Sequence, residues 1–342
     1  MASVFRAFGS KVTIIEFMKE CLPTMDQELA RRLRKSMEKQ GIVFHLGCGL
    51  QQVDGDKVTY QNVKKGTSET IEADCILVAT GRQANVEGLG LENTSIEVGR
   101  RGIEVDDNMQ TTVPHIYAIG DVNGRQMLAH AATFQGFHAI NHILGKTDNI
   151  RLNIMPAAVF THPEIASVGL TEDKCKEMGI ACAVRKSLYR ANGRAQASEA
   201  TDGLLKLVCD DQGKLIGCHA LGQEASWMVQ EVATLMNFDA TADRLAEIVH
   251  IHPTLSEILL NAASHIGILF SGWINKKYAL STITFACYFH NVFLERCCQL
   301  IKKAIVLYIE SLHHCHIIIS QLNSLFFTLS PLLLSSPHLL SG

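Results

Sequence analysis

The architecture can be predicted from a part of the chain that begins with the stretch Lys11-Val12-Thr13-Ile14-Ile15-Glu16-Phe17. Its nearly continuous apolar run is typical of a parallel strand that is covered on both faces. The capping-box spacing of Thr24-Met25-Asp26-Gln27 and the helical periodicity after it predict a helix from Thr24 to Gln40, which Gly41 ends. Residues 42–46 are the next predicted strand. This strand–helix–strand order predicts a doubly wound α/β sheet.

Short strands and helices are predicted in two further regions. Residues 57–63 and 69–73 form a predicted antiparallel pair, and residues 75–80 and 116–122 are predicted strands. A helix is predicted from Ala129 to Leu144. From Ile150 onwards the grouping of elements predicts an α+β domain. Its predicted strands are 159–161, 165–170, 204–209 and 214–220, and its predicted helices are 172–178, 227–236 and 242–248.

The composition limits the class of protein. A chain of 342 residues is long enough for two or three domains, and 47% hydrophobic with 19% charged residues fits a globular protein. A formal net charge of −3 argues against a nucleic-acid binder. The eleven cysteines include no Cys-x-x-Cys or Cys-x-x-x-x-Cys spacing, which favours a reducing, cytoplasmic location. No secretory signal is recognised at the N-terminus.

A first candidate binding site lies at Gly9-Ser10-Lys11-Val12-Thr13-Ile14-Ile15-Glu16. This segment resembles the second half of a dinucleotide fingerprint, in which a strand ends on an acid that binds the adenosine ribose. A carboxylate at Glu16 would repel a 2′-phosphate, which favours NAD over NADP. The alternative is that Glu16 is an ordinary polar residue at a strand end.

Four further motifs, in this order along the chain, carry a resemblance to a known family. They are Thr111-Thr112-Val113-Pro114-His115-Ile116-Tyr117-Ala118-Ile119-Gly120-Asp121, Phe160-Thr161-His162-Pro163-Glu164, Asn192-Gly193-Arg194-Ala195 and His252-Pro253-Thr254-Leu255-Ser256-Glu257. With them, residues 1–263 resemble the pyridine nucleotide-disulfide oxidoreductases, a flavoprotein family, and most closely its dihydrolipoamide dehydrogenase branch. The shared order is harder to obtain by chance than any single motif.

The resemblance implies cofactor contacts for four residues. Asp121 would accept a hydrogen bond from the ribityl chain of FAD, and Ala129 would begin the helix that approaches the flavin. Gly81 and Arg82 match an element on the nicotinamide side, where the glycine lets the backbone approach the cofactor. The alternatives are that Asp121 caps a loop and that Arg82 is a surface residue of a turn.

The resemblance also makes His252 the catalytic base and Glu257 its partner. A thiol with a pKa near 8.5 must lose a proton before it attacks a disulfide, and histidine is suited to accept it. A carboxylate on the other ring nitrogen would fix the tautomer. Alternatively, Glu257 completes a capping box with Thr254, so both roles require a shared carboxylate. His250 is interpreted as a packed or surface histidine.

These roles imply an NAD-dependent dihydrolipoyl dehydrogenase. Electrons would pass from dihydrolipoamide, or a lipoyl-bearing protein, to a cysteine disulfide and through FAD to NAD⁺. The family's Gly-x-Gly-x-x-Gly loop and Cys-x-x-x-x-Cys pair do not occur in the chain. The chain is therefore expected to be N-terminally truncated and inactive alone. The alternatives are a non-catalytic dimerising interaction module and a gene fragment without an independent role.

The predicted fold class is α/β, a partial doubly wound nucleotide-binding domain followed by an α+β dimerisation domain. The predicted boundaries are 1–82 for a partial NAD-binding domain, 83–150 for a central FAD-contacting segment and 151–263 for the dimerisation domain. The expected state is a homodimer with no nucleic-acid or membrane partner and no metal site.

Residues 264–342 differ from the rest of the chain. They hold six of the fifteen histidines, four of the eleven cysteines and only two acids, and they end in a Leu/Ser/Pro-rich segment. We expect a disordered or adventitious extension. The alternatives are a peripheral membrane contact and a His/Cys metal site, although the spacing matches no standard zinc pattern.

Overall fold

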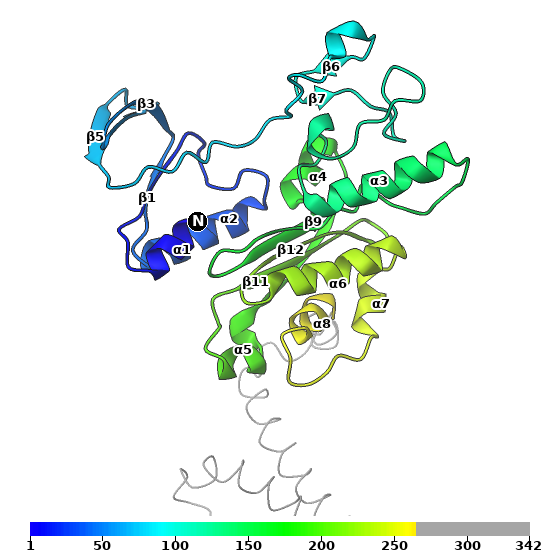
Figure 1. The fold of residues 1–342 in the computed structure, drawn as a ribbon. Helices are drawn as coiled ribbons and strands as arrows, with labels where there is room; N and C mark the ends of the chain where they lie inside the picture. Colours follow the sequence, from blue (N-terminus) through cyan, green and yellow to red (C-terminus); the bar gives the residue numbers. More distant parts are fainter. Residues whose placement is uncertain (265–342) are drawn as a thin grey trace, which may run out of the picture. The chain divides into compact units, whose positions relative to one another are not determined.

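The computed structural model describes residues 1–264, which Figure 1 colours along the sequence. The predictions of a disordered extension, a membrane contact and a metal site for the remainder of the chain lie outside the described residues. Within residues 1–264, no helix is long and apolar enough to cross a bilayer.

The N-terminal part contains the predicted strand–helix–strand unit. Helix α1 (Ala2–Ala7) is followed by β1 (Thr13–Glu16), α2 (Gln27–Lys39) and β2 (Val43–Leu46). Strands β1 and β2 pair in parallel, which confirms the predicted order. Helix α2 begins later than predicted because Asp26, and not Thr24, is its N-cap. The Asp26 carboxylate accepts the backbone N–H groups of Glu28 and Leu29 at 3.1 and 3.2 Å.

A small antiparallel sheet follows. It consists of β3 (Cys48–Asp54), β4 (Lys57–Asn62) and β5 (Ser68–Glu72), so the predicted pair β4–β5 is confirmed and β3 was missed. The short elements after it are the 3₁₀ turn η1 (Leu91–Asn93), β6 (Val98–Gly99), β7 (Gly102–Ile103) and the 3₁₀ turn η2 (Gly120–Asn123).

Two predicted strands are not formed in the described residues. Residues 75–80 pair with no other segment, and Leu77 and Val78 are exposed. Residues 116–119 make one isolated bridge, between Gln110 and Tyr117, before η2 begins. An apolar run becomes a strand only when a neighbour satisfies its backbone hydrogen bonds. The predicted helix after them is confirmed as α3 (Ala129–Ile143).

The C-terminal part is an antiparallel sheet with helices, as predicted. Its strands run in the order β10-β11-β12-β9-β8. They are β8 (Ala157–Val159), β9 (Ile165–Gly169), β10 (Ala183–Leu188), β11 (Leu204–Cys209) and β12 (Leu215–Leu221). The other elements are α4 (Glu172–Met178), η3 (Tyr189–Ala191), α5 (Gly193–Ala197), α6 (Ala225–Asn237), α7 (Ala242–Ala246) and α8 (Glu257–Ala263). Strand β10 was not predicted.

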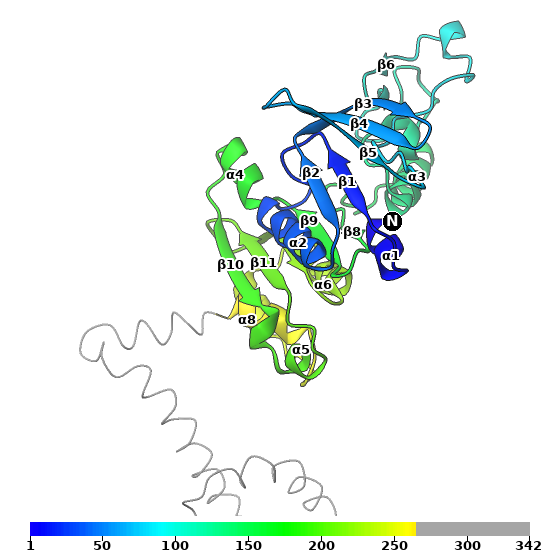
Figure 2. The ribbon, with the colours of Figure 1, turned by 90° about the vertical axis from the view of Figure 1, so that its left-hand side faces the viewer.

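The two faces of this sheet are covered by different helices. Leu205, Leu207 and Cys209 of β11 belong to a core with side chains of α6, α7 and α8. Leu204 belongs to a second cluster that includes Leu29 of α2. Helix α2 therefore packs on the face opposite to α6, as Figure 2 shows. The nucleotide-binding-type unit and the C-terminal sheet thus share one apolar cluster.

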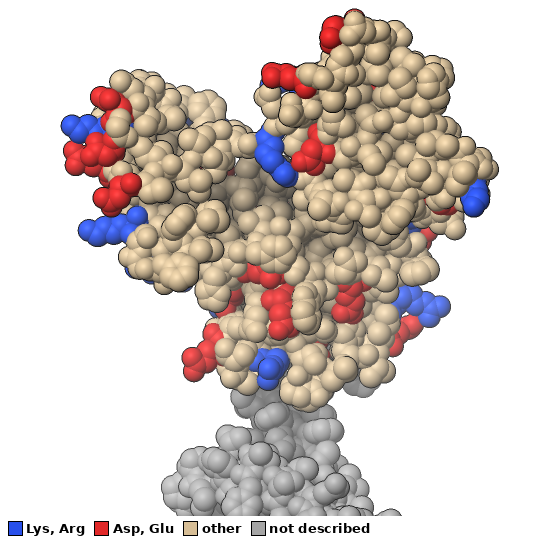
Figure 3. Space-filling model, in the orientation of Figure 1, with Lys and Arg blue, Asp and Glu red and all other residues tan. Residues whose placement is uncertain are grey.

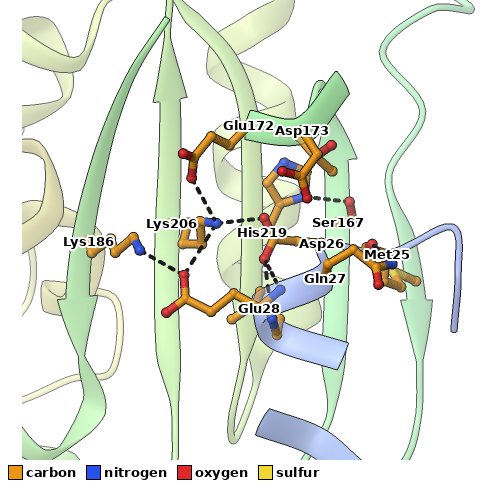
Figure 4. Close-up of polar contacts among 12 residues, drawn as sticks. Met25, Asp26, Gln27, Glu28, Ser167, Glu172, Asp173, Lys186, Lys206 and His219 are labelled. Atoms are coloured by element: carbon orange, nitrogen blue, oxygen red, sulfur yellow. Dashed lines mark hydrogen bonds and ion pairs between the residues drawn. The ribbon is translucent and has the colours of Figure 1, made fainter. Parts of the chain in front are cut away.

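An ionic cluster joins the start of α2 to the same face of the sheet (Figure 4). Lys206 Nζ lies 2.7 Å from Asp26 Oδ2, 3.5 Å from Glu28 Oε2 and 3.6 Å from Glu172 Oε2. Lys186 Nζ lies 2.7 Å from Glu28 Oε2. Burial disfavours the Lys206 ammonium, yet the hydrogen bond and charge of Asp26 raise its pKa above the ordinary value. Burial likewise disfavours the Glu28 carboxylate, but the two lysines hold its pKa below the ordinary value.

Charges of both signs are mixed on the surface that Figure 3 draws. Lys and Arg side chains lie next to Asp and Glu side chains there, rather than in one broad basic area. This distribution is in keeping with the small net charge of the chain.

Candidate functional site

The His252–Glu257 pair lies between α7 and the start of α8. His252 Nδ1 is 2.9 Å from Glu257 Oε1, and 79% of the histidine side chain is exposed. Glu257 is the first residue of α8, directly after the N-cap Ser256. The carboxylate therefore engages one ring nitrogen while the imidazole faces outward, and Nε2 remains accessible to a group approaching from solvent.

Glu257 contacts His252 and makes one of the two hydrogen bonds of the predicted capping box, although Ser256, and not Thr254, is the N-cap of α8. Its Oε2 accepts the backbone N–H of Thr254 at 2.9 Å while Oε1 contacts His252. The Thr254 N–H, followed by the hydrogen bond with His252, holds the pKa of this carboxyl below its usual range. Thr254 Oγ1 donates to the Ile251 carbonyl at 2.6 Å instead of capping α8. The carboxylate is thus shared, ionised and fixed by two partners.

His250 has a different environment from His252. Its Nε2 lies 3.1 Å from Glu231 Oε1 of α6, its Nδ1 lies 2.8 Å from the Ile248 carbonyl, and its side chain is 4% exposed. Both ring nitrogens are occupied, which agrees with the interpretation of His250 as a packed histidine. His252 is therefore the better candidate for proton transfer with an external group.

A second group of predicted residues meets at the start of α3. The Arg82 guanidinium lies 3.3 Å from Asp121 Oδ2 and also donates to the Met127 carbonyl. Ala129 is the first residue of α3, and no side chain caps the N-terminus of this helix. The first backbone N–H groups of α3 and the half-exposed Asp121 carboxylate are thus both available to a ligand that offers oxygen acceptors and hydroxyl donors.

Gly120 allows this arrangement because η2 passes close to α3. Its φ is +75°, and a Cβ at this position would come within 3.0 Å of the Ala132 Cβ. Gln135 of α3 accepts the Gly120 N–H through Oε1 at 2.8 Å and also binds the amide of Asn123 at 2.9 Å. Gln135 was missed in the sequence, where a glutamine within a helix carries no distinguishing signal.

Two of the three residues predicted to contact NAD, Glu16 and Gly81, share no hydrogen bond or ion pair with these groups within residues 1–264. Glu16 ends β1, as predicted, and its Oε1 accepts the Met18 N–H at 2.7 Å. Gly81 has φ +116° in an exposed, extended segment, and no atom lies near its potential Cβ. Within residues 1–264, no hydrogen bond or ion pair joins Glu16, the Arg82–Asp121 group and the His252–Glu257 pair.

Comparison with known proteins places this chain in a class. A sequence profile described as pyridine nucleotide-disulphide oxidoreductase matches residues 1–136, and the profile of that family's dimerisation domain matches residues 155–263. The two matches together take in most of the chain. The chain belongs to the pyridine nucleotide-disulphide oxidoreductases, whose members use FAD and NAD(H).

Within this family, the chain is similar to dihydrolipoyl dehydrogenases. It is 37% identical to dihydrolipoyl dehydrogenase 3 of Pseudomonas putida over 78% of this chain and 58% of that protein. It is 38% identical to the dihydrolipoyl dehydrogenase of Bacillus subtilis over 77% of this chain and 56% of that protein. The fold matches LpdA from Mycobacterium tuberculosis with a TM-score of 0.70 and 31% identity, over 77% of this chain and 57% of that one. The chain thus spans little more than half the length of these relatives.

Proposed function

We propose that this chain supplies the base and part of the cofactor contacts for oxidation of a dihydrolipoyl dithiol. The observation that carries the proposal is the 2.9 Å contact between His252 Nδ1 and Glu257 Oε1, with the imidazole exposed. An imidazole whose Nδ1 is held by a carboxylate can accept a proton at Nε2. The carboxylate then stabilises the imidazolium that forms.

In this proposal, His252 Nε2 removes the proton of one thiol of a dihydrolipoyl group. The resulting thiolate attacks a cysteine disulfide that another polypeptide segment would supply, because this sequence has no Cys-x-x-x-x-Cys pair; a mixed disulfide forms and one cysteine leaves as a thiolate. The second dihydrolipoyl thiol then attacks the mixed disulfide, which closes the lipoyl disulfide and releases the other cysteine as a thiol. FAD, when bound, would carry the two electrons onward to NAD⁺. The proton stays on His252, where Glu257 compensates its charge.

Some of the residues present are suited to contact FAD, and others are suited to contact NAD. Asp121 and the uncapped N-terminus of α3 are suited to the ribityl chain and the flavin edge, with Arg82 orienting the Asp121 carboxylate. Glu16 is suited to the adenosine ribose of NAD, and its Oε2 makes no hydrogen bond within residues 1–264. Gly81 leaves space for a close backbone approach. The segments 1–82, 83–150 and 151–263 are proposed as the NAD-binding, FAD-contacting and dimerisation parts.

We propose further that the chain forms a homodimer in the cytoplasm through residues 151–263. The proposal is supported by the dimerisation-domain match and by the exposed apolar side chains of Trp227, Val249 and Ile251. In this arrangement the His252 of one subunit would serve a disulfide of the other. The chain alone is expected to form no NADH from dihydrolipoamide and NAD⁺.

Subunit mixing tests the role of His252. The purified chain is mixed with a dihydrolipoyl dehydrogenase whose own catalytic histidine has been replaced, and NADH formation from dihydrolipoamide is followed. Restored activity is expected with the unmodified chain and with His250→Gln, but not with His252→Gln. Mixed dimers that form without restored activity would reject the catalytic role and favour a non-catalytic dimerising module. NADH formation by the chain on its own, at the rate of a normal flavoenzyme, would contradict the expected dependence on a second polypeptide.

A further inference from the structure

Asn192 is a buried polar residue for which the sequence predicted no individual role. It lies between η3 and α5 and is 3% exposed. Its Oδ1 accepts the Ala195 N–H at 2.9 Å, which makes Asn192 the N-cap of α5. Its Nδ2 donates to the Thr254 carbonyl at 3.0 Å. One carboxamide therefore joins the start of α5 to the segment that carries His252.

The two partners of Asn192 determine the orientation of its carboxamide. The Ala195 N–H requires an acceptor, and the Thr254 carbonyl requires a donor. Within residues 1–264, no other group donates to this carbonyl. Leu255, the next residue along the chain, packs in the same apolar cluster as Ala195. The contact between Asn192 and Thr254 is thus part of the packed interior.

Thr254 connects Asn192 to the His252–Glu257 pair. Its carbonyl accepts from Asn192, and its N–H donates to Glu257 Oε2 at 2.9 Å. The other carboxylate oxygen of Glu257 lies 2.9 Å from His252 Nδ1. Three hydrogen bonds in series therefore join the buried start of α5 to an imidazole that is largely exposed. A displacement of Thr254 would take away the second partner of the Glu257 carboxylate.

The segment between α7 and α8 is held by side chains of other elements. Residues 247–256 form no helix or strand. Before His252, the side chain of His250 lies 3.1 Å from Glu231 of α6. After it, Asn192 provides the corresponding contact from the start of α5. Hydrogen bonds to two different helices thus fix the backbone on both sides of His252.

We propose that Asn192 is a positioning residue for proton transfer by His252. Its hydrogen bond to Thr254 keeps the Glu257 carboxylate on Nδ1, so that the neutral imidazole carries its proton there. Nε2 is then free to accept the proton of a dihydrolipoyl thiol. Asn192 acts only through Thr254 and Glu257 and does not contact the dithiol. This inference rests on the proposed function, because it assigns a role in the same reaction.

Two substitutions separate the donor of Asn192 from its helix cap. Asn192→Ser retains a capping oxygen and removes the carboxamide N–H groups, whereas Asn192→Asp retains the shape and the cap but ends in an ionised carboxylate without a proton to donate. The matched control is Thr171→Ala, which removes the N-cap of α4 but no hydrogen bond to residues 250–257. Circular dichroism shows that each variant is folded, and either Asn192 variant alone is enough for the test.

Nitrogen NMR of the full-length chain tests the positioning directly. The chain carries isotope-labelled histidine, and the signals of His252 are identified by their loss in His252→Gln. Spectra are recorded at about pH 8.5, where imidazoles are neutral, and the ring-nitrogen shifts show which nitrogen is protonated. We expect a proton on Nδ1 in the parent and in Thr171→Ala, and a mixture of both tautomers in the Asn192 variants. An unchanged tautomer in these variants would overturn the proposal.

Subunit mixing separates this role from the proposed function. In mixed dimers with a dihydrolipoyl dehydrogenase that lacks its catalytic histidine, Asn192→Ser should lower kcat on the order of tenfold. The KM for dihydrolipoamide should change little, because Asn192 does not contact it, and Thr171→Ala should match the unmodified chain. An equal kcat for Asn192→Ser and the unmodified chain would overturn the positioning role. If the unmodified chain restores no activity, the base role of His252 is rejected, and the tautomer in the Asn192 variants still decides whether Asn192 positions the ring.

Discussion

Lys206 occupies an unusual position for a lysine. Its side chain is 3% exposed within a strand whose other residues are apolar, and three carboxylates surround its ammonium. Burial of a charge is tolerated only when partners replace the water that it loses. Because the partners come from α2 and α4 while Lys206 comes from β11, the cluster couples three elements that are distant in sequence.

Replacing this ammonium should destabilise the protein strongly. Lys206→Met leaves the buried Asp26 carboxylate without its partner and should lower the free energy of unfolding by about 3–5 kcal/mol, measured by urea denaturation. Lys186→Met removes a largely exposed ammonium from the same cluster and should cost less than about 1 kcal/mol. Equal losses for the two variants would show that burial of the pair does not determine its contribution.

Glu257 should make a pH-dependent contribution to stability. Because its folded-state pKa lies below its value in the unfolded chain, the carboxylate stabilises the fold above the range in which unfolded glutamates titrate, about pH 4.3. This contribution is lost as the pH falls through the lower folded-state pKa. Glu257→Gln should therefore cost about 1 kcal/mol near neutral pH, and the difference from the parent should shrink in acid. The measurement is urea denaturation at several pH values, with the exposed Glu177→Gln as the control. A cost for Glu257→Gln that does not change with pH would argue against the lowered pKa.

The residue types of the site were predictable, whereas most contacts between them were not. The spacing of His252 and Glu257 is short, so a local motif was enough to predict the contacts of the Glu257 carboxylate with His252 and with the Thr254 N–H. The Arg82–Asp121 ion pair and the hydrogen bond from the Gly120 N–H to Gln135 join segments that only the fold brings together. A single sequence gives no spacing rule for such contacts.

At the level of elements, the start of α2 combines a helix cap with an ion pair. One oxygen of Asp26 accepts two backbone N–H groups, and the other contacts Lys206. Since Asn caps helices about as well as Asp, the two functions can be separated by mutation.

Asp26→Asn keeps the cap and removes the charge, whereas Asp26→Ala removes both. We expect the alanine variant to be less stable than the asparagine variant by about 1 kcal/mol, the usual contribution of an N-cap. Thermal unfolding followed by circular dichroism measures this difference. Equal stability of the two variants would mean that the backbone N–H groups find other acceptors.

The elements that the sequence predicted well are those with their own periodicity or a local partner. The helices α3 and α4 and the hairpin β4–β5 belong to this group. Residues 75–80 and 116–122 have strand-like composition, but within residues 1–264 they lack neighbouring strands. Composition reports a preference for extended backbone, whereas a strand also needs a second segment to pair with.

At the level of the whole molecule, self-association should depend on the apolar residues next to His252. Val249 and Ile251 are 95% and 78% exposed in the segment between α7 and α8. We expect Val249→Ser with Ile251→Ser to raise the dimer dissociation constant on the order of tenfold or more, measured by analytical ultracentrifugation. Val53→Ser, which changes an exposed residue of β3, should leave it unchanged. A parent chain that stays monomeric at all concentrations would refute the proposed homodimer.

Lys206 also affects the register in which β11 pairs with β10 and β12. Four of its six residues are Leu or Val and occupy both faces, so the apolar pattern alone would tolerate a shift by one position. Such a slip would separate the ammonium from Asp26, Glu28 and Glu172 and turn it toward the apolar core that β11 forms with α6, α7 and α8. This single lysine therefore makes the shifted registers of β11 less stable than the native register, although the apolar side chains alone would stabilise both.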